Sequence, residues 1–285
     1  SVHIFNSYIL MALVVIPFMG ACVMAFIPRD SSRKIQGLSA ILALVILSLS
    51  AYVFLGYDNE QAGYQFTREF GWLDPLGITF HLGVDGISVP MVLLTGIVTF
   101  TGVLISWNIE YRLKDFFVLF FLLVAGVFGV FASLDLFFFF FFYELAVLPM
   151  YLLIGVWGSS SDFGTFLRTK EYGAMKLVLY LVAGSVLVWI AILAIYWAAS
   201  EAGTATFLMQ SVAGEPTALE DINFNDSFRH FNTLFFPFFM VGFGVLAGLW
   251  PFHTWSPDGH VAAPTAVSML HAGVLMKLGA YGIIR

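Results

Sequence analysis

The sequence has 285 residues, of which 60% are hydrophobic and only 11% are charged. A soluble domain carries about 25% charged residues, so this composition excludes a soluble enzyme or binding domain and indicates a polytopic membrane protein. The net charge of −6 comes without a basic patch, which argues against nucleic acid as a partner. Cys22 is the only cysteine, which excludes an intrachain disulfide and a cysteine-based metal cluster.

Hydrophobic segments follow one another along the chain, each close to the ~20 residues with which a helix crosses a bilayer. The segments lie at about 8–27, 36–55, 86–107, 116–132, 135–157, 172–199, 232–250 and 261–284. We therefore predict an all-α, polytopic transmembrane helix bundle of about eight spans. The two longest gaps hold a polar and aromatic loop at 56–85 and an acidic loop at 200–231.

Positive charge is distributed unevenly between the two sets of alternating loops. The loops after the first, third and fifth spans contain Arg29, Arg33, Lys34, Arg112, Lys114, Arg168 and Lys170. The opposite loops contain only Arg68 and Arg229. Because Lys and Arg concentrate in cytoplasmic loops, this asymmetry predicts a cytoplasmic first set and an N-terminus outside the cell.

The segment 135–157 begins with Asp135 and contains one further carboxylate, Glu144, within an apolar run. Six consecutive phenylalanines, 137–142, precede Tyr143 and Glu144. At ~1.5 Å per residue the segment covers the ~30 Å hydrocarbon core, which places Glu144 near the midplane. A charged residue there costs roughly 2.5 kcal/mol or more and normally faces protein or water, so we expect Glu144 to line a proton path. The alternative is a structural acid paired with a neighbouring helix.

Three further ionisable residues fall inside predicted spans, and each has a structural alternative. Lys176 lies near the start of its span, where a lysine can also extend its ammonium to the membrane surface. Lys277 lies deep within 261–284 and is either a proton-path residue or half of an interhelical ion pair. His271 lies just under two turns before Lys277, so the two side chains need not share a helix face. A lone membrane histidine is also compatible with a packing role.

The stretch 250–265 interrupts the helical pattern. Pro251, Pro257 and Pro264 recur every seven residues, so we predict that the seventh span ends here and that a broken segment opens the eighth. Irregular backbone at membrane depth is tolerated where it lines a cavity, and discontinuous helices carry sites in many transporters. The polar groups at this break are His253, Asp258, His260, Thr265 and Ser268. A rigid turn with capping residues is the alternative.

Several motifs together resemble the antiporter-like membrane subunits of respiratory complex I, in their M-subunit branch. These are His-Leu-Gly-Val-Asp-Gly-Ile-Ser (81–88), the charged turn 110–117, the phenylalanine run with Glu144 (135–145), Pro-Phe-His-Thr-Trp (251–255), and the segment from Ala263 to Gly282 that contains Ala-Gly-Val-Leu-Met-Lys. The resemblance runs through nearly the whole chain.

The resemblance implies a particular organisation of the fold. The family is built from two inverted five-helix repeats in about fourteen spans. By that comparison, 1–110 is an N-terminal three-helix segment with the external loop 56–85, and 111–285 is one antiporter-like five-helix repeat. The second inverted repeat is absent from this chain, so we expect a truncated sequence or a split subunit.

The resemblance also implies a function, namely proton translocation as a subunit of an NADH:quinone oxidoreductase. The matching proton-path residues are Glu144, Lys176, Lys277, His253 and His260, and we add His271 to them. No redox centre, metal site, cofactor site or catalytic residue is expected in this chain. NAD(H), flavin, iron–sulfur clusters and quinone belong to partner subunits, and the L-type and N-type antiporter-like subunits are the expected membrane neighbours. We expect a multi-pass protein of an energy-transducing membrane, most simply the bacterial inner membrane.

Two departures from the family pattern leave alternatives open. The family has a lysine where this chain has Leu246, and a proline where it has Gly248. A leucine cannot pair with Glu144, so either Lys176 takes over as its partner or the half-channel is altered. The alternative functions are a subunit of a multisubunit Na⁺/H⁺ antiporter or membrane-bound hydrogenase, and a non-conducting structural subunit.

Overall fold

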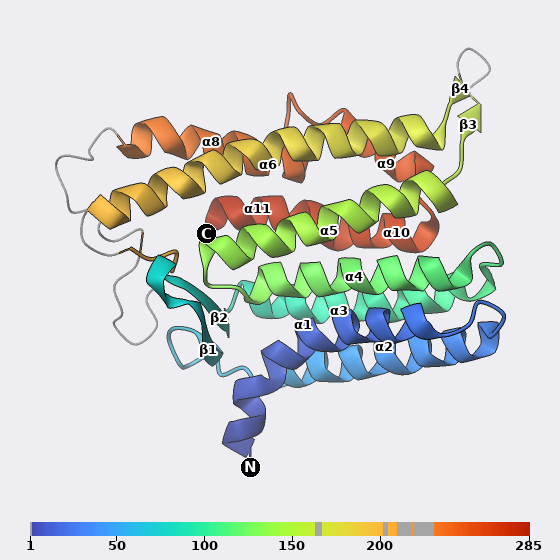
Figure 1. The fold of residues 1–285 in the computed structure, drawn as a ribbon, viewed down its shortest axis with the longest axis horizontal. Helices are drawn as coiled ribbons and strands as arrows, with labels where there is room; N and C mark the ends of the chain where they lie inside the picture. Colours follow the sequence, from blue (N-terminus) through green and yellow to red (C-terminus); the bar gives the residue numbers. More distant parts are fainter. Residues whose placement is uncertain (1, 163–166, 202–204, 210–217, 219–230) are drawn as a thin grey trace.

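The computed structural model describes residues 2–162, 167–201, 205–209, 218 and 231–285 (Figure 1). Its long helices run nearly parallel or antiparallel to one another. The helices are α1 (Val2–Phe26), α2 (Ser32–Leu55), α3 (Ser88–Ile105), α4 (Leu113–Ala132), α5 (Leu136–Trp157), α6 (Lys170–Glu201), α8 (Phe231–Ala247), α9 (Trp255–Ala262), α10 (Thr265–Leu270) and α11 (Met276–Ile284). Short 3₁₀ turns occupy Asp74–Leu76 and Ser106–Asn108, and a π-helical turn, His271–Leu275, joins α10 to α11.

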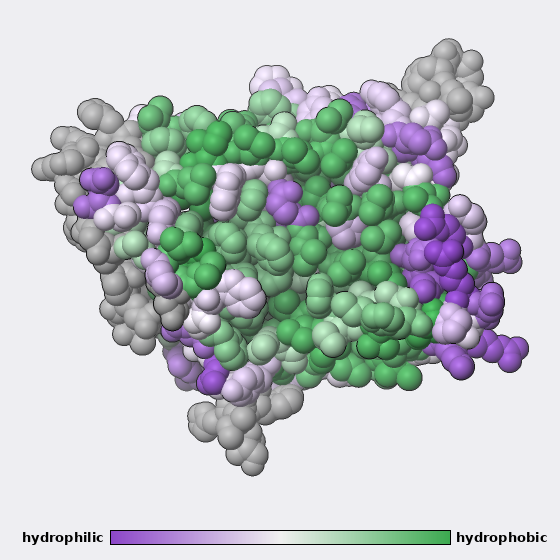
Figure 2. All heavy atoms as spheres, viewed as in Figure 1, coloured by the Kyte–Doolittle hydropathy of each residue, from purple (hydrophilic) through white to green (hydrophobic). Residues whose placement is uncertain are grey.

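The predicted helix bundle is confirmed, and seven helices of the described chain are long and apolar enough to span a membrane. They match the predicted segments except 232–250, which corresponds to the shorter helix α8 of 17 residues. Whether α8 crosses the bilayer stays a prediction. Figure 2 shows apolar side chains over the middle of one face, with hydrophilic ones gathered mainly at the ends of the helices. That banding is the surface expected of a bilayer-embedded bundle.

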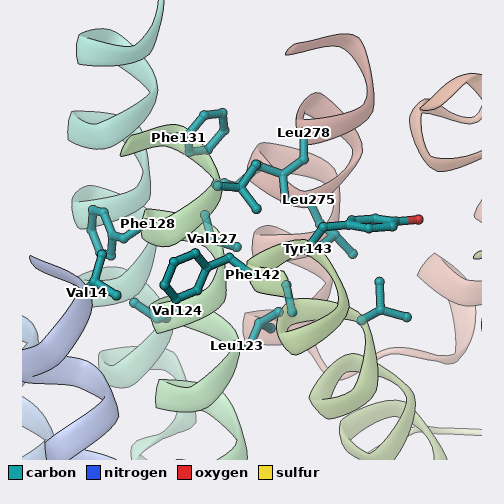
Figure 3. Close-up of a cluster of buried hydrophobic side chains, with 14 of the residues drawn as sticks. Val14, Leu123, Val124, Val127, Phe128, Phe131, Phe142, Tyr143, Leu275 and Leu278 are labelled. Carbon is teal, nitrogen blue, oxygen red and sulfur yellow. The ribbon is translucent and has the colours of Figure 1, made fainter. Parts of the chain in front are cut away.

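Helix α4 forms the centre of the packing. In its span, 78% of the residues are buried, a larger share than in any other described span. Phe142 of α5 points toward Val124 and Val127 of α4, and Val14 of α1 approaches the same cluster from the other side (Figure 3). Phenylalanines are bulky and rigid, so the run 137–142 supplies rings on every side of α5. The run therefore serves helix packing, whereas Glu144 is the exception within it.

Helix α5 begins at a capping residue that the sequence places in a short turn. The Asp135 carboxylate accepts N–H groups from Phe137 at 2.8 Å and Phe138 at 3.1 Å, satisfying donors that a helix start leaves free. It also accepts the Thr79 N–H of β2 at 3.2 Å. Pro149 does not interrupt α5, which continues to Trp157.

The loop 56–85 contains a β-hairpin that the all-α expectation did not include. Strands β1 (Gln65–Leu73) and β2 (Ile78–Val84) pair antiparallel, with Gln65 opposite Val84. Aromatic residues alternate with polar ones here, a pattern typical of a half-buried strand, and Gly77 with φ +65° permits the tight connection. A second, two-residue pairing joins β3 (Ser161–Asp162) to β4 (Leu167–Arg168) between α5 and α6.

The predicted break at 250–265 is present. Helix α8 ends at Ala247, where Gly248 adopts φ +70° and Leu249 N–H donates to the Gly244 carbonyl at 2.8 Å, the pattern of a glycine-terminated helix. The break nevertheless contains a short helix, α9, which includes Pro257. Pro257 lies in the first turn of α9, where a missing N–H costs nothing.

The motif 81–88 owes its form to Asp85. Its carboxylate accepts the Ser88 N–H at 3.0 Å, so it caps α3, and it also binds the Arg285 guanidinium through two hydrogen bonds, one of 2.8 Å. Burial raises the pKa of Asp85, but the hydrogen bonds from Arg285 and Ser88 outweigh it and hold the pKa below its ordinary value. Arg285 also donates to the Tyr64 hydroxyl at 3.0 Å. These contacts join the β-hairpin loop to the end of α11.

We predict that α6 and α8 depend on two facing glycines. A Cβ on Gly242 would lie 2.6 Å from the Gly184 carbonyl oxygen, closer than side chains approach backbone atoms. Gly242→Ala should therefore force the helices apart and cost about 1–3 kcal/mol, which thermal unfolding of the purified protein would register as a lower midpoint. Gly37→Ala is the matched control, because a Cβ there meets nothing within 4 Å. Equal midpoints for the two variants would contradict this account of the α6–α8 contact.

We predict that Asp85→Asn destabilises the protein by about 1–3 kcal/mol, because it leaves a buried guanidinium with a weaker partner while keeping a residue that caps helices. The Arg285 side chain is only 6% exposed, compared with 46% for Arg112 in the surface pair with Asp115. Asp115→Asn is therefore the matched control, with an expected cost of about 0–1 kcal/mol.

The Asp85 contribution should depend on pH in one direction. Because the folded pKa of Asp85 is lowered, its stabilisation is fully present above the unfolded pKa of about 3.9 and disappears as pH falls through the folded value. The difference in thermal midpoint between wild type and Asp85→Asn should stay constant from about pH 5 to pH 8 and shrink in more acidic buffer. A difference that grows on acidification would contradict the assignment.

Candidate functional site

Glu144 lies in the middle of α5, on the side that faces α6. The residue is half-buried, and one carboxylate oxygen, Oε1, has no hydrogen-bond partner among the described residues. The side chain beside its carboxylate is Ser185 of α6. One turn earlier, Phe140 stacks on Trp189 of α6 with ring centroids 4.8 Å apart. Glu144 therefore lies at an aromatic helix–helix contact with one hydroxyl nearby, and no ion pair to it is found in the described part of the chain.

Lys176 has a different partner from the one expected. Its ammonium lies 2.7 Å from the Asp258 carboxylate of α9, and the two side chains are 20% and 4% exposed. Ser185, the residue beside Glu144, follows Lys176 by nine positions, so the two sites lie roughly 13 Å apart along α6. Of the two alternatives that Leu246 left open, the structure therefore does not favour Lys176 as the partner of Glu144. Leu246, at the position of that missing lysine, is buried in the apolar core.

Two of the predicted histidines are brought together. The rings of His260 (α9) and His271 (π-helical turn) stack with centroids 4.1 Å apart, and Trp255 stacks on the other side of His271 at 5.2 Å. His260 Nδ1 lies 3.1 Å from the Ser268 hydroxyl. His271 is completely buried, and neither of its ring nitrogens has a partner among the described residues. Such a group is costly to keep dry, so this is a site for an exchangeable proton or a bridging water.

The π-helical turn shapes the surroundings of Lys277. π-Helical turns are rare in proteins overall, and those that occur are often found at functional sites. The turn displaces the backbone so that the Lys277 ammonium donates to the Ala272 carbonyl at 2.9 Å. Lys277 is exposed on the surface of this chain, in the middle of the span Thr265–Ile284. The inference that His271 and Lys277 need not share a face is confirmed, since His271 is buried.

His253, like Lys277, is a predicted site residue with an exposed side chain. It occupies the turn between α8 and α9 and is exposed, and its backbone carbonyl accepts the Ser256 N–H at 3.1 Å. The chain around it is held by neighbours: Tyr180 of α6 lies 3.1 Å from the Thr254 hydroxyl, and the Trp255 indole donates to the Val245 carbonyl. His253 therefore has a structural setting without a contact to the other predicted residues.

Four of the six predicted residues fall into three groups along the bundle, and Lys277 and His253 lie outside them. Glu144 lies with Ser185, Lys176 lies with Asp258, and His260 lies with His271. Sequence reasoning named Asp258 only as one polar group at the break and missed its pairing with Lys176. The signal available was an acidic residue beside Pro257 and opposite a membrane lysine, but the sequence does not reveal which two helices touch. All three groups are suited to holding and moving protons, and no cluster of metal-binding side chains occurs within the described ranges.

Comparison with known proteins shows which family the chain resembles. Residues 133–285, more than half of the sequence, match the NADH:quinone oxidoreductase/Mrp antiporter transmembrane family. The NAD(P)H-quinone oxidoreductase chain 4 2 of Trichodesmium erythraeum is 32% identical over 277 residues, which is 97% of this chain and 46% of that protein. The NADH-quinone oxidoreductase subunit M of Rhodobacter capsulatus is 34% identical over 274 residues, which is 95% of this chain and 51% of that protein.

A solved structure shares the fold. Respiratory complex I from Thermus thermophilus with bound NADH contains a chain with a TM-score of 0.75 at 23% identity. The match covers 97% of this chain and 52% of that chain. The chain thus spans about half the length of the curated relatives it matches. The resemblance seen in the motifs is confirmed, and the chain belongs to the NADH:quinone oxidoreductase/Mrp antiporter transmembrane family.

Proposed function

We propose that this chain is a proton-translocating membrane subunit of an NADH:quinone oxidoreductase of the complex I type, driven by electron transfer in other subunits. The observation that carries the proposal is Glu144, an acid in the middle of an apolar span with an unpartnered carboxylate oxygen. Such a group is expensive to retain unless protons reach it. The relatives in Trichodesmium and Rhodobacter, named as quinone oxidoreductase subunits, support the electron-transfer partner.

The proposed path uses Glu144, Lys176, Lys277, His253, His260 and His271. Lys277 supports a larger assembly, because an exposed ammonium at mid-span is too costly to face lipid. We expect further membrane helices to cover it, as the roughly twofold length of the relatives suggests. His253 would join the path only when such helices close over the α8–α9 turn.

We propose the following organisation within the membrane. Residues 1–110 form an N-terminal three-helix segment and 111–285 one antiporter-like repeat, an arrangement supported by the family match beginning at residue 133. The basic loops lie on the cytoplasmic side of an energy-transducing membrane, with the N-terminus outside. The acidic residues of 202–230 lie outside the described residues. L-type and N-type subunits are the proposed neighbours, and NAD(H), flavin, iron–sulfur clusters and quinone are assigned to other chains.

Two alternatives have specific observations in their favour. The matched family includes Mrp antiporter subunits, so a Na⁺/H⁺ antiporter subunit would show the same fold. Copurification with flavin and iron–sulfur subunits favours the first function, and copurification with other antiporter subunits favours the second. A non-conducting structural role is favoured by Leu246, which cannot form the ion pair that Glu144 lacks.

We predict that Glu144→Gln lowers proton pumping by at least tenfold while the complex still assembles. The amide keeps the size and polarity of the side chain but cannot take up and release a proton. Pumping is measured as acidification of inverted membrane vesicles, and assembly by native gel electrophoresis. Glu171→Gln, in the exposed first turn of α6, is the control. Unchanged pumping in an assembled Glu144→Gln complex would point to the structural alternative.

We predict that His271→Phe separates packing from proton transfer at the stacked histidines. Phenylalanine keeps a flat ring between Trp255 and His260 and removes two buried nitrogens that lack partners, so the thermal midpoint should stay equal or rise. If His271 carries protons, pumping falls in the same variant. His260→Phe, in contrast, loses the contact with Ser268, so in that variant the thermal midpoint should fall. Wild-type pumping by His271→Phe would assign that residue to packing.

A further inference from the structure

The end of the bundle that carries the basic loops contains a small cavity. It lies between the α5–α6 connection, the start of α6 and the end of α9, near the β3–β4 pairing labelled in Figure 1. Its volume of about 10 Å³ is close to what one water molecule requires. Its lining residues are Ser159, Ser161, Thr169, Tyr172, Gly173, Asp258, Val261 and Ala262. Half of these residues carry hydroxyl groups, which can hydrogen-bond to a water in an otherwise mostly apolar cavity.

Asp258 is the carboxylate of this cavity. It is only 4% exposed, in contrast to Ser159, which is exposed where the cavity reaches the surface of the protein. Its Oδ2 binds the Lys176 ammonium at 2.7 Å. The contact depends on the close approach of α9 to α6 at Gly173, where a Cβ would lie 3.0 Å from the Asp258 carbonyl oxygen. The fold thus presents a buried carboxylate to a water-sized space that opens near the membrane surface.

The position of Asp258 along α9 connects the cavity to the stacked histidines. His260 follows Asp258 by two residues and contacts Ser268 and His271. Gly259 lies between Asp258 and His260 in the sequence, and a Cβ added to it would lie 3.4 Å from Cε1 of the His271 ring. Asp258 thus lies beside the hydroxyls of the cavity and close in sequence to a histidine pair, one member of which, His271, has ring nitrogens without a partner among the described residues.

We propose that Asp258 is the proton-uptake residue of this subunit, with Lys176 as its positioning partner. This inference rests on the proposed proton-translocating function and adds the site at which protons leave the aqueous phase. A hydronium ion in the cavity gives a proton to the Asp258 carboxylate: one O–H bond of the hydronium breaks, a neutral water remains, and a new O–H bond forms on Asp258. The neutral acid no longer holds the Lys176 ammonium, and it then releases the proton toward the interior of the bundle. The cycle ends when the carboxylate binds Lys176 again.

Charged, titratable and hydroxyl groups approach Asp258 from several elements. Lys176 and Tyr172 approach from α6, with the Lys176 ammonium 5.8 Å from the Tyr172 ring centroid. His260 is the titratable neighbour on α9 itself, and the α5–α6 connection contributes the hydroxyls of Ser159, Ser161 and Thr169.

The test is Asp258→Asn in the assembled complex, with proton pumping by inverted vesicles measured from pH 6 to pH 8. Without the carboxylate, protons come directly from hydronium in water. The pumping rate of the variant should therefore fall about tenfold for each unit by which the pH rises, while the wild-type rate stays nearly constant. Azide, a small weak acid that carries protons into such cavities, should restore the rate. Asp115→Asn, which removes an acid from an exposed pair with Arg112 at the same end of the bundle, should behave like wild type.

The remaining outcomes decide against the inference in distinguishable ways. Wild-type pumping by Asp258→Asn, together with loss of pumping by Glu144→Gln, overturns the uptake site and keeps the proposed function. Wild-type pumping by both variants overturns both. If Asp258→Asn fails to assemble, the double variant Asp258→Asn with Lys176→Met removes the unpaired ammonium and is tested in the same way. Slow pumping without the pH slope or azide rescue, or failure of both variants to assemble, assigns the pair to holding α9 against α6.

Discussion

The cost of placing charge in an apolar environment governs this structure. In the described chain, most charged side chains lie in loops, in strands or in the end turns of helices, and most of those inside the bundle are held by specific neighbours. Asp258 holds Lys176, Asp85 holds Arg285, and the π-helical turn offers the Ala272 carbonyl to Lys277. The exceptions are Glu144 and His271, which retain unpartnered atoms in the described chain. Uncompensated polar atoms in a well-packed protein call for a water, an ion or a functional role to explain them.

Different residues in this fold pack the helices and place polar groups inside the bundle, although the two kinds of residue are neighbours in the sequence. Phenylalanines pack α5 against α4 and α6, and glycines such as Gly184 and Gly242 let neighbouring helices approach closely. Small residues at helix contacts are what membrane bundles use in place of a strong hydrophobic driving force. His253 and His271 lie where the helical pattern is interrupted, at the α8–α9 turn and the π-helical turn, whereas Glu144 and Lys176 lie within α5 and α6. Rigid packing thus surrounds a small number of adaptable polar positions.

Local patterns predicted much of the fold. Apolar length located seven spanning helices, the spacing of prolines located the break after α8, and the acidic residue at 135 marked the start of α5. The β-hairpin was missed because its alternating aromatic and polar residues resemble an extended loop until the two strands are seen to pair. The effect of Pro257 could not be judged from the sequence, because it depends on where α9 begins.

The sequence by itself determined that this is a membrane helix bundle of the antiporter-like family and which residues bring charge into it, because hydropathy and motifs are properties of single segments. Only the tertiary structure decided the partners. It paired Lys176 with Asp258 instead of Glu144, stacked His260 on His271, and joined Asp85 to Arg285 across 200 residues. The physical reason is that an ion pair forms between whichever charges the packing of distant helices brings within about 4 Å, and no local pattern contains that distance.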